Sequence, residues 1–516
     1  MKKIFGHVIL ATTVSACAVA GDGLDSLLSD VVEVAPRQPF DQGMPHINGP
    51  AEFGVSPGKA CVFSFPVRGK RPLTFKISGK LPSGVVFDTA TGRLSGRPEK
   101  EGDYPVTVTV INAVGQDEKK FTLRVHPHKI GLAPLLGWTS WNACRIDFDQ
   151  AKILRIAHAM VSTGLASRGY SYVNLDSGWQ ACTRDKTTKA LNANHRFPDM
   201  AAMVREIHSL GLRAGIYSTP MVIAFGSTVC EIFRGSRGYP VDVAESLQPP
   251  GLRRFGGIGK LSLEREDAVC WAKWGFDYLK YDWPGCSVKY AGIMADALRA
   301  TDRDFVMSLT TKCSPKFAQE YRTLANMYRN NDDTEPVWQS VCNNIRSADD
   351  WLEHTGKGSW FDLDMLAIGP MHAEFGGKRL TRDETILEFS AWALLGSPIQ
   401  ISCDLEKIDD FTLDVLSNEE LLSVNQDTTG SAKLVKCSVE QRDGRTNKEL
   451  RIYRKVLADG SAAYGFFNLG DESVEETFDL PKKCTVCDLW SRRVFGETDS
   501  LKMRIPAHGA RVFRIR

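Results

Sequence analysis

The stretch Gly275–Trp283, with the sequence GFDYLKYDW, predicts both a central element of the fold and a functional site. Its aromatic and aliphatic residues favour a β-strand, and residues 263–274 before it favour a helix. Alternate side chains of a strand share one face, so Tyr278, Lys280 and Asp282 point the same way. Burying a cation and a carboxylate at the end of an apolar strand is costly. Two interpretations are open: an ion pair that closes a packed layer, or a catalytic carboxylate kept ionised by a lysine.

Strands and helices alternate on both sides of this stretch, from about residue 135 to residue 426. Strands are predicted at 136–141, 170–176, 213–219, 276–283, 305–311, 327–332, 360–366 and 399–405, with helices such as 151–163, 201–210, 338–354 and 383–395. Eight βα units in about 290 residues are typical of a (β/α)8 TIM barrel, whose chemistry lies at the carboxyl ends of the strands. We predict that this barrel spans residues 131–428.

Two β-rich regions flank the predicted barrel, which suits a chain of 516 residues, too long for one core. Residues 44–128 contain short strands of alternating apolar and polar residues and predict a small β-sandwich. Within them, residues 81–96 (LPSGVVFDTATGRLSG) resemble the Ig-like modules of secreted bacterial proteins. Residues 432–516 contain only short strand-like runs and predict a terminal antiparallel β-sandwich.

The N-terminus has the pattern of a secretory signal, which we predict over residues 1–20. Two lysines precede an apolar run at residues 8–14, which is too short for a transmembrane helix. The sequence VSAC at 14–17 also resembles a bacterial lipobox, in which Cys17 would carry a lipid; simple cleavage near Ala16 is the alternative. Residues 21–43 are predicted to be a linker. We expect an exported bacterial protein: periplasmic, anchored to the outer membrane as a lipoprotein, or secreted.

Composition narrows the range of partners. A formal net charge of +2 without a basic stripe argues against nucleic acid as the main partner. The CxxC pair Cys484 and Cys487 has no second ligand pair near it in the sequence, so it does not predict a zinc site. There is no histidine pair, Ser-His-Asp set or phosphate-binding loop. We therefore expect no metal and no cofactor.

Carboxylates and aromatic residues stand at the predicted carboxyl ends of the barrel strands. They include Trp141, Asp176, Tyr217, Asp282, Asp333 and Asp364, and the cations Lys280 and Arg329 stand among them. Such a set suits a sugar site, because carboxylates accept hydrogen bonds from hydroxyls, rings cover apolar sugar faces, and two carboxyl groups cleave a glycosidic bond. The sequence thus predicts a carbohydrate-active site, with oligosaccharides or glycoconjugate glycans as partners.

Seven stretches in order then resemble glycoside hydrolase family 27, the melibiase-type α-galactosidases and α-N-acetylgalactosaminidases. They are LGWTSWN (136–142), YVNLDSGW (172–179), GIYS (215–218), YLKYD (278–282), RNNDD (329–333), DML (364–366) and LGSP (395–398). The resemblance covers residues 135–426 and the sandwich that follows. It implies a retaining exo-glycosidase that removes terminal α-linked galactose-type residues.

The resemblance also implies roles for the two acids. Asp282 would be the nucleophile, forming a covalent glycosyl-enzyme, and Asp333 the acid/base. Lys280 would bind ring hydroxyls and hold Asp282 ionised. Arg329 would bind a hydroxyl and lower the pKa of Asp333, an effect that burial would have to offset.

Other assignments depend on the loops around these acids. Asp332 and Glu335 remain alternatives for the acid/base. By resemblance, Trp141 would stack on the sugar, Asp176 and Tyr217 would contact hydroxyls, and Asp364 would line the pocket. The resemblance also implies a disulfide between Cys230 and Cys286, which would link the loops after the third and fourth strands.

Two positions depart from the family pattern. Ser177 stands where the family has a second acid. The segment 308–312 (SLTTK), which contains Thr311, stands where family members contact the substituent on carbon 2 of the sugar. Losing a charged acceptor changes specificity more than chemistry. α-N-Acetylgalactosaminides and β-L-arabinopyranosides are therefore alternative substrates. A secreted, non-catalytic carbohydrate-binding protein is the alternative of another class.

Overall fold

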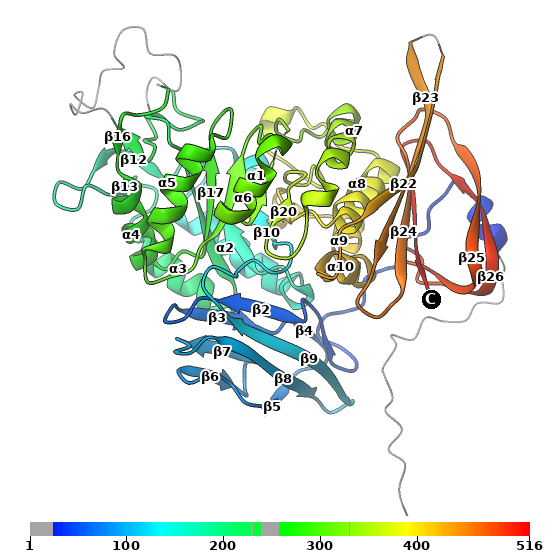
Figure 1. Cartoon of the computed structure of the whole chain (residues 1–516), viewed down its shortest axis with the longest axis horizontal. Helices are drawn as coiled ribbons and strands as arrows, with labels where there is room; N and C mark the ends of the chain where they lie inside the picture. Colours follow the sequence, from blue (N-terminus) through cyan, green and yellow to red (C-terminus); the bar gives the residue numbers. More distant parts are fainter. Residues whose placement is uncertain (1–23, 229–230, 239–256, 330, 443) are drawn as a thin grey trace, which may run out of the picture.

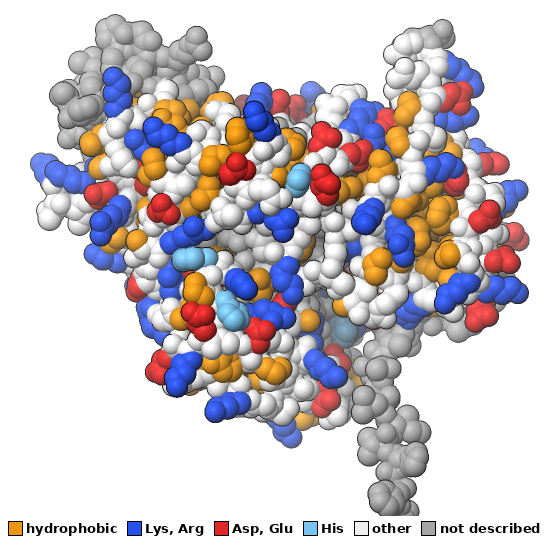
Figure 2. All heavy atoms as spheres, in the orientation of Figure 1, with side chains coloured by type: hydrophobic (Ala, Val, Ile, Leu, Met, Phe, Trp, Pro, Cys, Tyr) orange, Lys and Arg blue, Asp and Glu red, His pale blue; other side chains and the backbone are white. Residues whose placement is uncertain are grey.

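The computed structural model describes residues 24–228, 231–238, 257–329, 331–442 and 444–516 (Figure 1). A central barrel is flanked by an N-terminal β-domain, drawn in blue, and by a C-terminal β-domain, drawn in orange and red. The predicted signal, Cys17 and Cys230 lie outside the described residues. Lysine, arginine and acidic side chains are interspersed on the face shown in Figure 2. Among the described residues, every helix is too short or too polar to span a lipid bilayer.

The barrel contains eight parallel strands, and each lies beside the next strand of the βα series. They are β10 (Leu136–Thr139), β11 (Tyr172–Asn174), β14 (Arg213–Ser218), β17 (Tyr278–Asp282), β18 (Val306–Thr310), β19 (Met327–Tyr328), β20 (Trp360–Phe361) and β21 (Ile399–Ile401). β10 pairs with β21, and a parallel bridge between Leu366 and Ile401 closes the ring. The predicted (β/α)8 barrel is confirmed.

Helices cover the outside of the barrel. They are α2 (Gln150–Ser162), α3 (Met200–Ser209), α4 (Glu264–Trp274), α5 (Val288–Arg299), α6 (Ala318–Leu324), α7 (Trp338–Ser347), α8 (Arg382–Leu395), α9 (Asp410–Leu416) and α10 (Glu419–Gln426). Local sequence sets their ends: Thr381 and Glu384 form a capping box at the start of α8. Gly275 adopts φ +98° at the end of α4, which favours glycine and lets the chain turn into β17.

The N-terminal domain is a small sandwich of two main sheets. One contains β2 (Glu52–Val55), β9 (Gln116–Val125), β8 (Gly102–Ile111) and β5 (Thr74–Gly79), and the other β3 (Cys61–Ser64), β7 (Arg93–Gly96) and β6 (Val85–Asp88). Alternating side chains such as Phe63, Phe121 and Leu123 fill the core between them. The predicted Ig-like architecture is confirmed.

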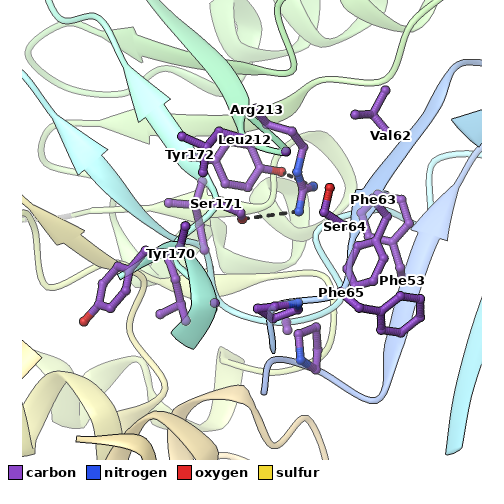
Figure 3. Close-up of a pocket in the computed structure, with 18 of the residues that line it drawn as sticks. Phe53, Val62, Phe63, Ser64, Phe65, Tyr170, Ser171, Tyr172, Leu212 and Arg213 are labelled. Atoms are coloured by element: carbon purple, nitrogen blue, oxygen red, sulfur yellow. Dashed lines mark hydrogen bonds between the residues drawn. The ribbon is translucent and has the colours of Figure 1, made fainter. Parts of the chain in front are cut away.

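The Ig-like domain packs against the N-terminal end of the barrel, opposite the end where the chemistry of such barrels lies. Arg213, at the start of β14, lies 5.0 Å from the ring of Phe53 and 4.3 Å from that of Tyr172. Its guanidinium donates to the Tyr172 hydroxyl (2.7 Å) and to Ser171 (3.4 Å), as Figure 3 shows. A cavity of about 350 Å³ lies between the domains at this point.

The C-terminal domain is a six-stranded antiparallel sheet in which β25 and β26 lie opposite β22–β24 (Figure 1). Its strands are β22 (Lys433–Arg442), β23 (Arg445–Val456), β24 (Ala462–Asn468), β25 (Val474–Asp488), β26 (Val494–Ile505) and β27 (Ala510–Ile515). Side chains from both halves, such as Phe466 and Met503, share one core. The predicted antiparallel β-sandwich is confirmed.

The described part of the segment interpreted as a linker, residues 24–43, is packed against other domains. A short helix, Leu24–Leu28, places Leu27 in the core of the C-terminal domain. The Ala35 amide donates to the Trp490 carbonyl (2.9 Å), and Arg37 forms ion pairs with acidic residues of α9. Leu27, an apolar residue in a mostly polar stretch, therefore helps to hold this segment against the C-terminal domain.

Candidate active site

The carboxyl end of β17 places Lys280 and Asp282 on one face of the strand, at the mouth of the barrel. The neighbouring strand β14 is in register, with Tyr217 beside Lys280. The Tyr217 hydroxyl donates to Oδ2 of Asp282 at 3.2 Å. Both Tyr217 and Asp282 are buried. The Asp282 carboxylate therefore lies at the bottom of the mouth with its orientation fixed by a phenol.

Lys280 makes its direct ion pair with Asp176, which follows β11. Nζ lies 2.7 Å from Oδ2 of Asp176, and Oδ1 of this carboxylate accepts from the Ser177 amide at 2.7 Å. The Asp176 amide donates to Ser140 Oγ at 2.9 Å, which fixes the backbone at this point. The ion pair inferred from the sequence exists, but its carboxylate comes from a different strand.

Arg329, just after β19, organises the opposite wall. Its side chain is 1% exposed, Nη2 donates to Oδ1 of Asp333 at 2.8 Å, and Nη1 forms an ion pair with Asp364. Oδ2 of Asp364 also accepts from the amide of Thr334 at 2.6 Å, which ties down the loop carrying Asp333. The Asp333 side chain remains 47% exposed. It is thus fixed on one side and open to an incoming molecule on the other.

The two alternatives for the acid/base lie outside this cluster. The Asp332 side chain is 85% exposed and pairs with Lys312 at 3.3 Å. Glu335 is exposed, and its amide donates to Ser340 Oγ. Of the three acids, Asp333 is the one that Arg329 holds.

The electrostatics of the two central acids differ from the expectation. Burial raises the pKa of Asp282 to about 6; Lys280 and Arg329 oppose this shift, and Asp333 adds to it. Lys280 therefore does not overcome the effect of burial on Asp282. For Asp333, desolvation raises the pKa, but Arg329 and Lys280 outweigh it and the net shift is downward. Burial thus does not offset Arg329, and the two carboxylates are close enough to influence each other.

The remaining predicted ligand contacts differ in accessibility. Trp141, at the start of α1 (Trp141–Cys144), is half-buried and has the Arg145 guanidinium 5.0 Å from its ring. Thr311 is half-buried just after β18, and its amide donates to the Trp283 carbonyl at 3.2 Å. Ser177 is fully buried, and its hydroxyl donates to the Phe225 carbonyl at 2.6 Å. The Ser177 hydroxyl is therefore already engaged by the protein.

Two other tryptophans in the motifs belong to the core. Trp138 and Trp179 are fully buried, and their indole N–H groups donate to the carbonyls of Cys403 (2.8 Å) and Tyr217 (2.9 Å). Asp362 is buried beside Asp364 and accepts a bond from its amide at 2.8 Å, and burial raises the Asp362 pKa to about 7. These three residues are therefore part of the buried framework that carries the site.

Sequence reasoning missed two features next to the site. Arg145 lies against the rings of Trp141 and Phe375 and is held by Glu374 at 2.9 Å. The sequence signal for the contact between Arg145 and Trp141 was their spacing, because side chains four residues apart in a helical segment meet. The second feature is a contact between two cysteines: Cys313, just after β18, lies against Cys286. Within the described parts of the chain, no group of His, Cys, Asp and Glu side chains is arranged to hold a metal ion.

A (β/α)8 barrel whose mouth gathers four carboxylates, a lysine, an arginine and aromatic rings is typical of a glycoside hydrolase. A family model described as Alpha galactosidase A matches residues 133–248 and 251–427. A model of the α-galactosidase C-terminal β-sandwich domain matches residues 447–515, and a model of an Ig domain matches residues 45–126. The chain belongs to the α-galactosidase family, glycoside hydrolase family 27.

Individual proteins agree with this assignment. The chain is 30% identical over 382 residues to α-galactosidase 2 of Arabidopsis thaliana, covering 72% of this chain and 84% of that protein. A solved Bacteroides fragilis structure, provisionally assigned as an α-galactosidase, has 25% identity and a TM-score of 0.78, covering 93% of this chain and 99% of that chain. A family 27 β-L-arabinopyranosidase from Geobacillus stearothermophilus shares the fold, with 20% identity, a TM-score of 0.63, and coverage of 74% and 96%.

Proposed function

We propose that this hydrolase is a retaining exo-α-glycosidase that removes terminal α-linked galactose-type residues. The observation that carries the proposal is the pair of acids at the mouth: Asp282 is buried at the bottom, and Asp333 is half-exposed and held by Arg329. One acid suits attack on a sugar ring enclosed in the barrel, and the other suits contact with the leaving group at its rim. The names of the relatives support galactose as the sugar.

The two acids share the chemistry in two steps. In the first, an Asp282 oxygen forms a bond to the anomeric carbon while the glycosidic C–O bond breaks and Asp333 gives its proton to the leaving oxygen. In the second, Asp333 takes a proton from water, whose oxygen attacks the anomeric carbon and releases Asp282. Two inversions give net retention. The mechanism requires the two carboxyl groups to be about 5–5.5 Å apart.

Other residues of the mouth would bind and orient the sugar. The Asp176 side chain, fixed by Lys280, would accept hydrogen bonds from ring hydroxyls, and the remaining N–H groups of Lys280 can donate to the sugar. The exposed part of the Trp141 ring would cover an apolar sugar face. Tyr217 would keep Asp282 aligned for attack through its 3.2 Å hydrogen bond.

The identity of the sugar is tested by hydrolysis of nitrophenyl α-galactoside, α-N-acetylgalactosaminide and β-L-arabinopyranoside. We expect the highest kcat/KM on the α-galactoside, with the α-anomer of galactose as the first product seen by NMR. A higher kcat/KM on either of the other two glycosides would show that its sugar, and not galactose, is the preferred substrate. Hydrolysis of none of them, with sugar binding retained, would identify a carbohydrate-binding protein.

Ser177→Asp should increase the preference for sugars that carry a 6-hydroxyl. An added carboxylate beside Asp176 would accept a hydrogen bond that an arabinopyranoside, which lacks the hydroxymethyl group, cannot donate. The ratio of kcat/KM for the galactoside to that for the arabinopyranoside should rise about tenfold. Ser177→Asn, of similar size without the charge, is the matched control. An unchanged ratio in Ser177→Asp would show that this position does not read the sugar.

The pH profile of kcat/KM should fall on the alkaline side with a pKa of about 6. Activity requires one proton on the pair, with Asp282 ionised and Asp333 protonated. The pair loses that proton at the raised pKa of Asp282, about 6, so kcat/KM decreases tenfold per pH unit above it. A second proton binds at the lowered pKa of Asp333, which sets the acidic limb. A profile that is flat between about pH 5 and 8 would contradict this assignment.

We also propose that the protein is exported and acts on glycans outside the cytoplasm. The predicted signal over residues 1–20 supports export, and the VSAC sequence supports a lipid on Cys17. Expression of the full chain in a Gram-negative host, followed by fractionation, tests both points. Export with a membrane-bound, fatty-acid-labelled product that Cys17→Ser makes soluble would support the anchor; retention of unprocessed chain in the cytoplasm would contradict export.

A further inference from the structure

Two cysteines from neighbouring barrel loops meet directly behind the active site. Cys286 lies in the loop after β17, four residues beyond Asp282, and Cys313 lies in the segment after β18. Their sulfur atoms are 2.6 Å apart, and both side chains are buried. A covalent S–S bond is about 2.05 Å long. The two thiols therefore need only a small adjustment of their side chains to form a bond.

Both cysteines are fixed to the framework around the site. The Cys313 amide donates to the carbonyl of Arg329 at 2.9 Å. The carbonyl of Cys286 accepts from the hydroxyl of Tyr321 at 2.7 Å. Three residues before each cysteine, the same two segments are joined by the backbone, because the Trp283 amide donates to the Thr310 carbonyl at 2.7 Å. The cysteine pair thus joins the loop that follows Asp282 to the segment that holds Arg329.

We propose that Cys286 and Cys313 form a disulfide that positions the nucleophile loop against the arginine that holds the second acid. The bond rests on the proposed export, which supplies the oxidant, and its effect on turnover rests on the proposed hydrolysis. The two thiols are oxidised by a small-molecule or protein disulfide: one S–S bond forms in the chain, the oxidant's S–S bond breaks, and the two protons go to its thiols. An exported protein meets such oxidants.

Burial determines when this bond forms. Desolvation, together with the neighbouring Cys313 sulfur, raises the pKa of the Cys286 thiol well above its ordinary value. Because the thiolate is the reactive species, the folded dithiol reacts slowly with an oxidant. The bond therefore forms while the loops are still open during folding, and it is then shielded from reductants.

Peptide mapping tests the bond directly. The full chain is refolded with reduced and oxidised glutathione, alkylated in denaturant without a reductant, and digested with trypsin. Tyr281–Lys289 and Cys313–Lys316 each contain one cysteine, so a linked pair of these peptides reports the bond. We expect this pair in most molecules. Alkylation of both cysteines, or linkage of Cys286 to Cys230, would overturn the proposal.

Kinetics tests the positioning role. Compared with protein refolded under reducing conditions, the oxidised protein should have a kcat about tenfold higher, a KM within about twofold, and a Tm about 5 °C higher. Cys313→Ala should have the low kcat under both conditions. Cys342→Ala, which removes a buried thiol on α7, is the matched control and should keep the redox response. A Tm shift without a change in kcat, or a redox response retained in Cys313→Ala, would refute the positioning role.

Discussion

Asp282→Asn should lower kcat on the best glycoside of the panel by on the order of 10⁴-fold, about 5.4 kcal/mol of transition-state stabilisation. The amide is nearly the same size as the carboxylate, but it cannot form the glycosyl-enzyme. Tyr217 can still donate its hydrogen bond to the oxygen of the new side-chain amide, so the fold should persist. Steady-state kinetics measures the loss, and circular dichroism with Tm checks the fold. A rate near that of the unmodified enzyme would exclude Asp282 as the nucleophile.

The stereochemistry of a rescued reaction distinguishes a nucleophile from a merely structural carboxylate. Asp282→Gly leaves a space beneath the anomeric carbon that a small anion such as azide can enter. A single displacement on an α-galactoside then gives the β-galactosyl azide, with inverted configuration. NMR of the product provides the readout. Formation of the α-azide, or no rescue by azide with an intact fold, would place the nucleophile elsewhere.

Asp333→Asn should lower kcat/KM by about 10²–10⁴-fold on substrates with a sugar leaving group. The effect on dinitrophenyl glycosides should be much smaller, because this leaving group departs without a proton. Azide should accelerate breakdown of the glycosyl-enzyme in Asp333→Ala and give the α-galactosyl azide, with retained configuration. The dependence on leaving group is the measurement that identifies an acid.

Asp332→Asn is the matched control for the second acid. Its side chain is next in sequence but 85% exposed, and it pairs with Lys312 rather than Arg329. This variant should keep kcat/KM within about twofold on all substrates, since surface ion pairs of this kind contribute little. A large loss in Asp332→Asn, with Asp333→Asn near normal, would reverse the assignment.

Much of the fold could be predicted from local patterns. The sequence predicts a helix over 263–274, and the structure has it at Glu264–Trp274; the strand predicted after it includes Tyr278–Asp282. These elements follow from residue type, from helical or strand periodicity and from a glycine that ends the helix. The alternation of eight such units then indicates a barrel, because consecutive parallel strands lie side by side.

The site was only partly predictable, because its residues meet through tertiary contacts. The pattern KYD suggests an ion pair between Lys280 and Asp282, yet the direct partner of Lys280 is Asp176, 104 residues away. The family pattern has an acid at position 177, whereas the Ser177 hydroxyl of this chain donates to the carbonyl of Phe225. Neither partner follows from spacing, since both come from other strands and loops.

The order of the elements and the side chains at the strand ends could be predicted from local sequence, because propensity, periodicity and turn chemistry act over a few neighbouring residues. The partner of Lys280, the raised pKa of Asp282 and the contact of Cys286 with Cys313 arise only in the folded chain. Charge interactions, burial and sulfur contacts depend on distances in space between residues that are far apart in the sequence.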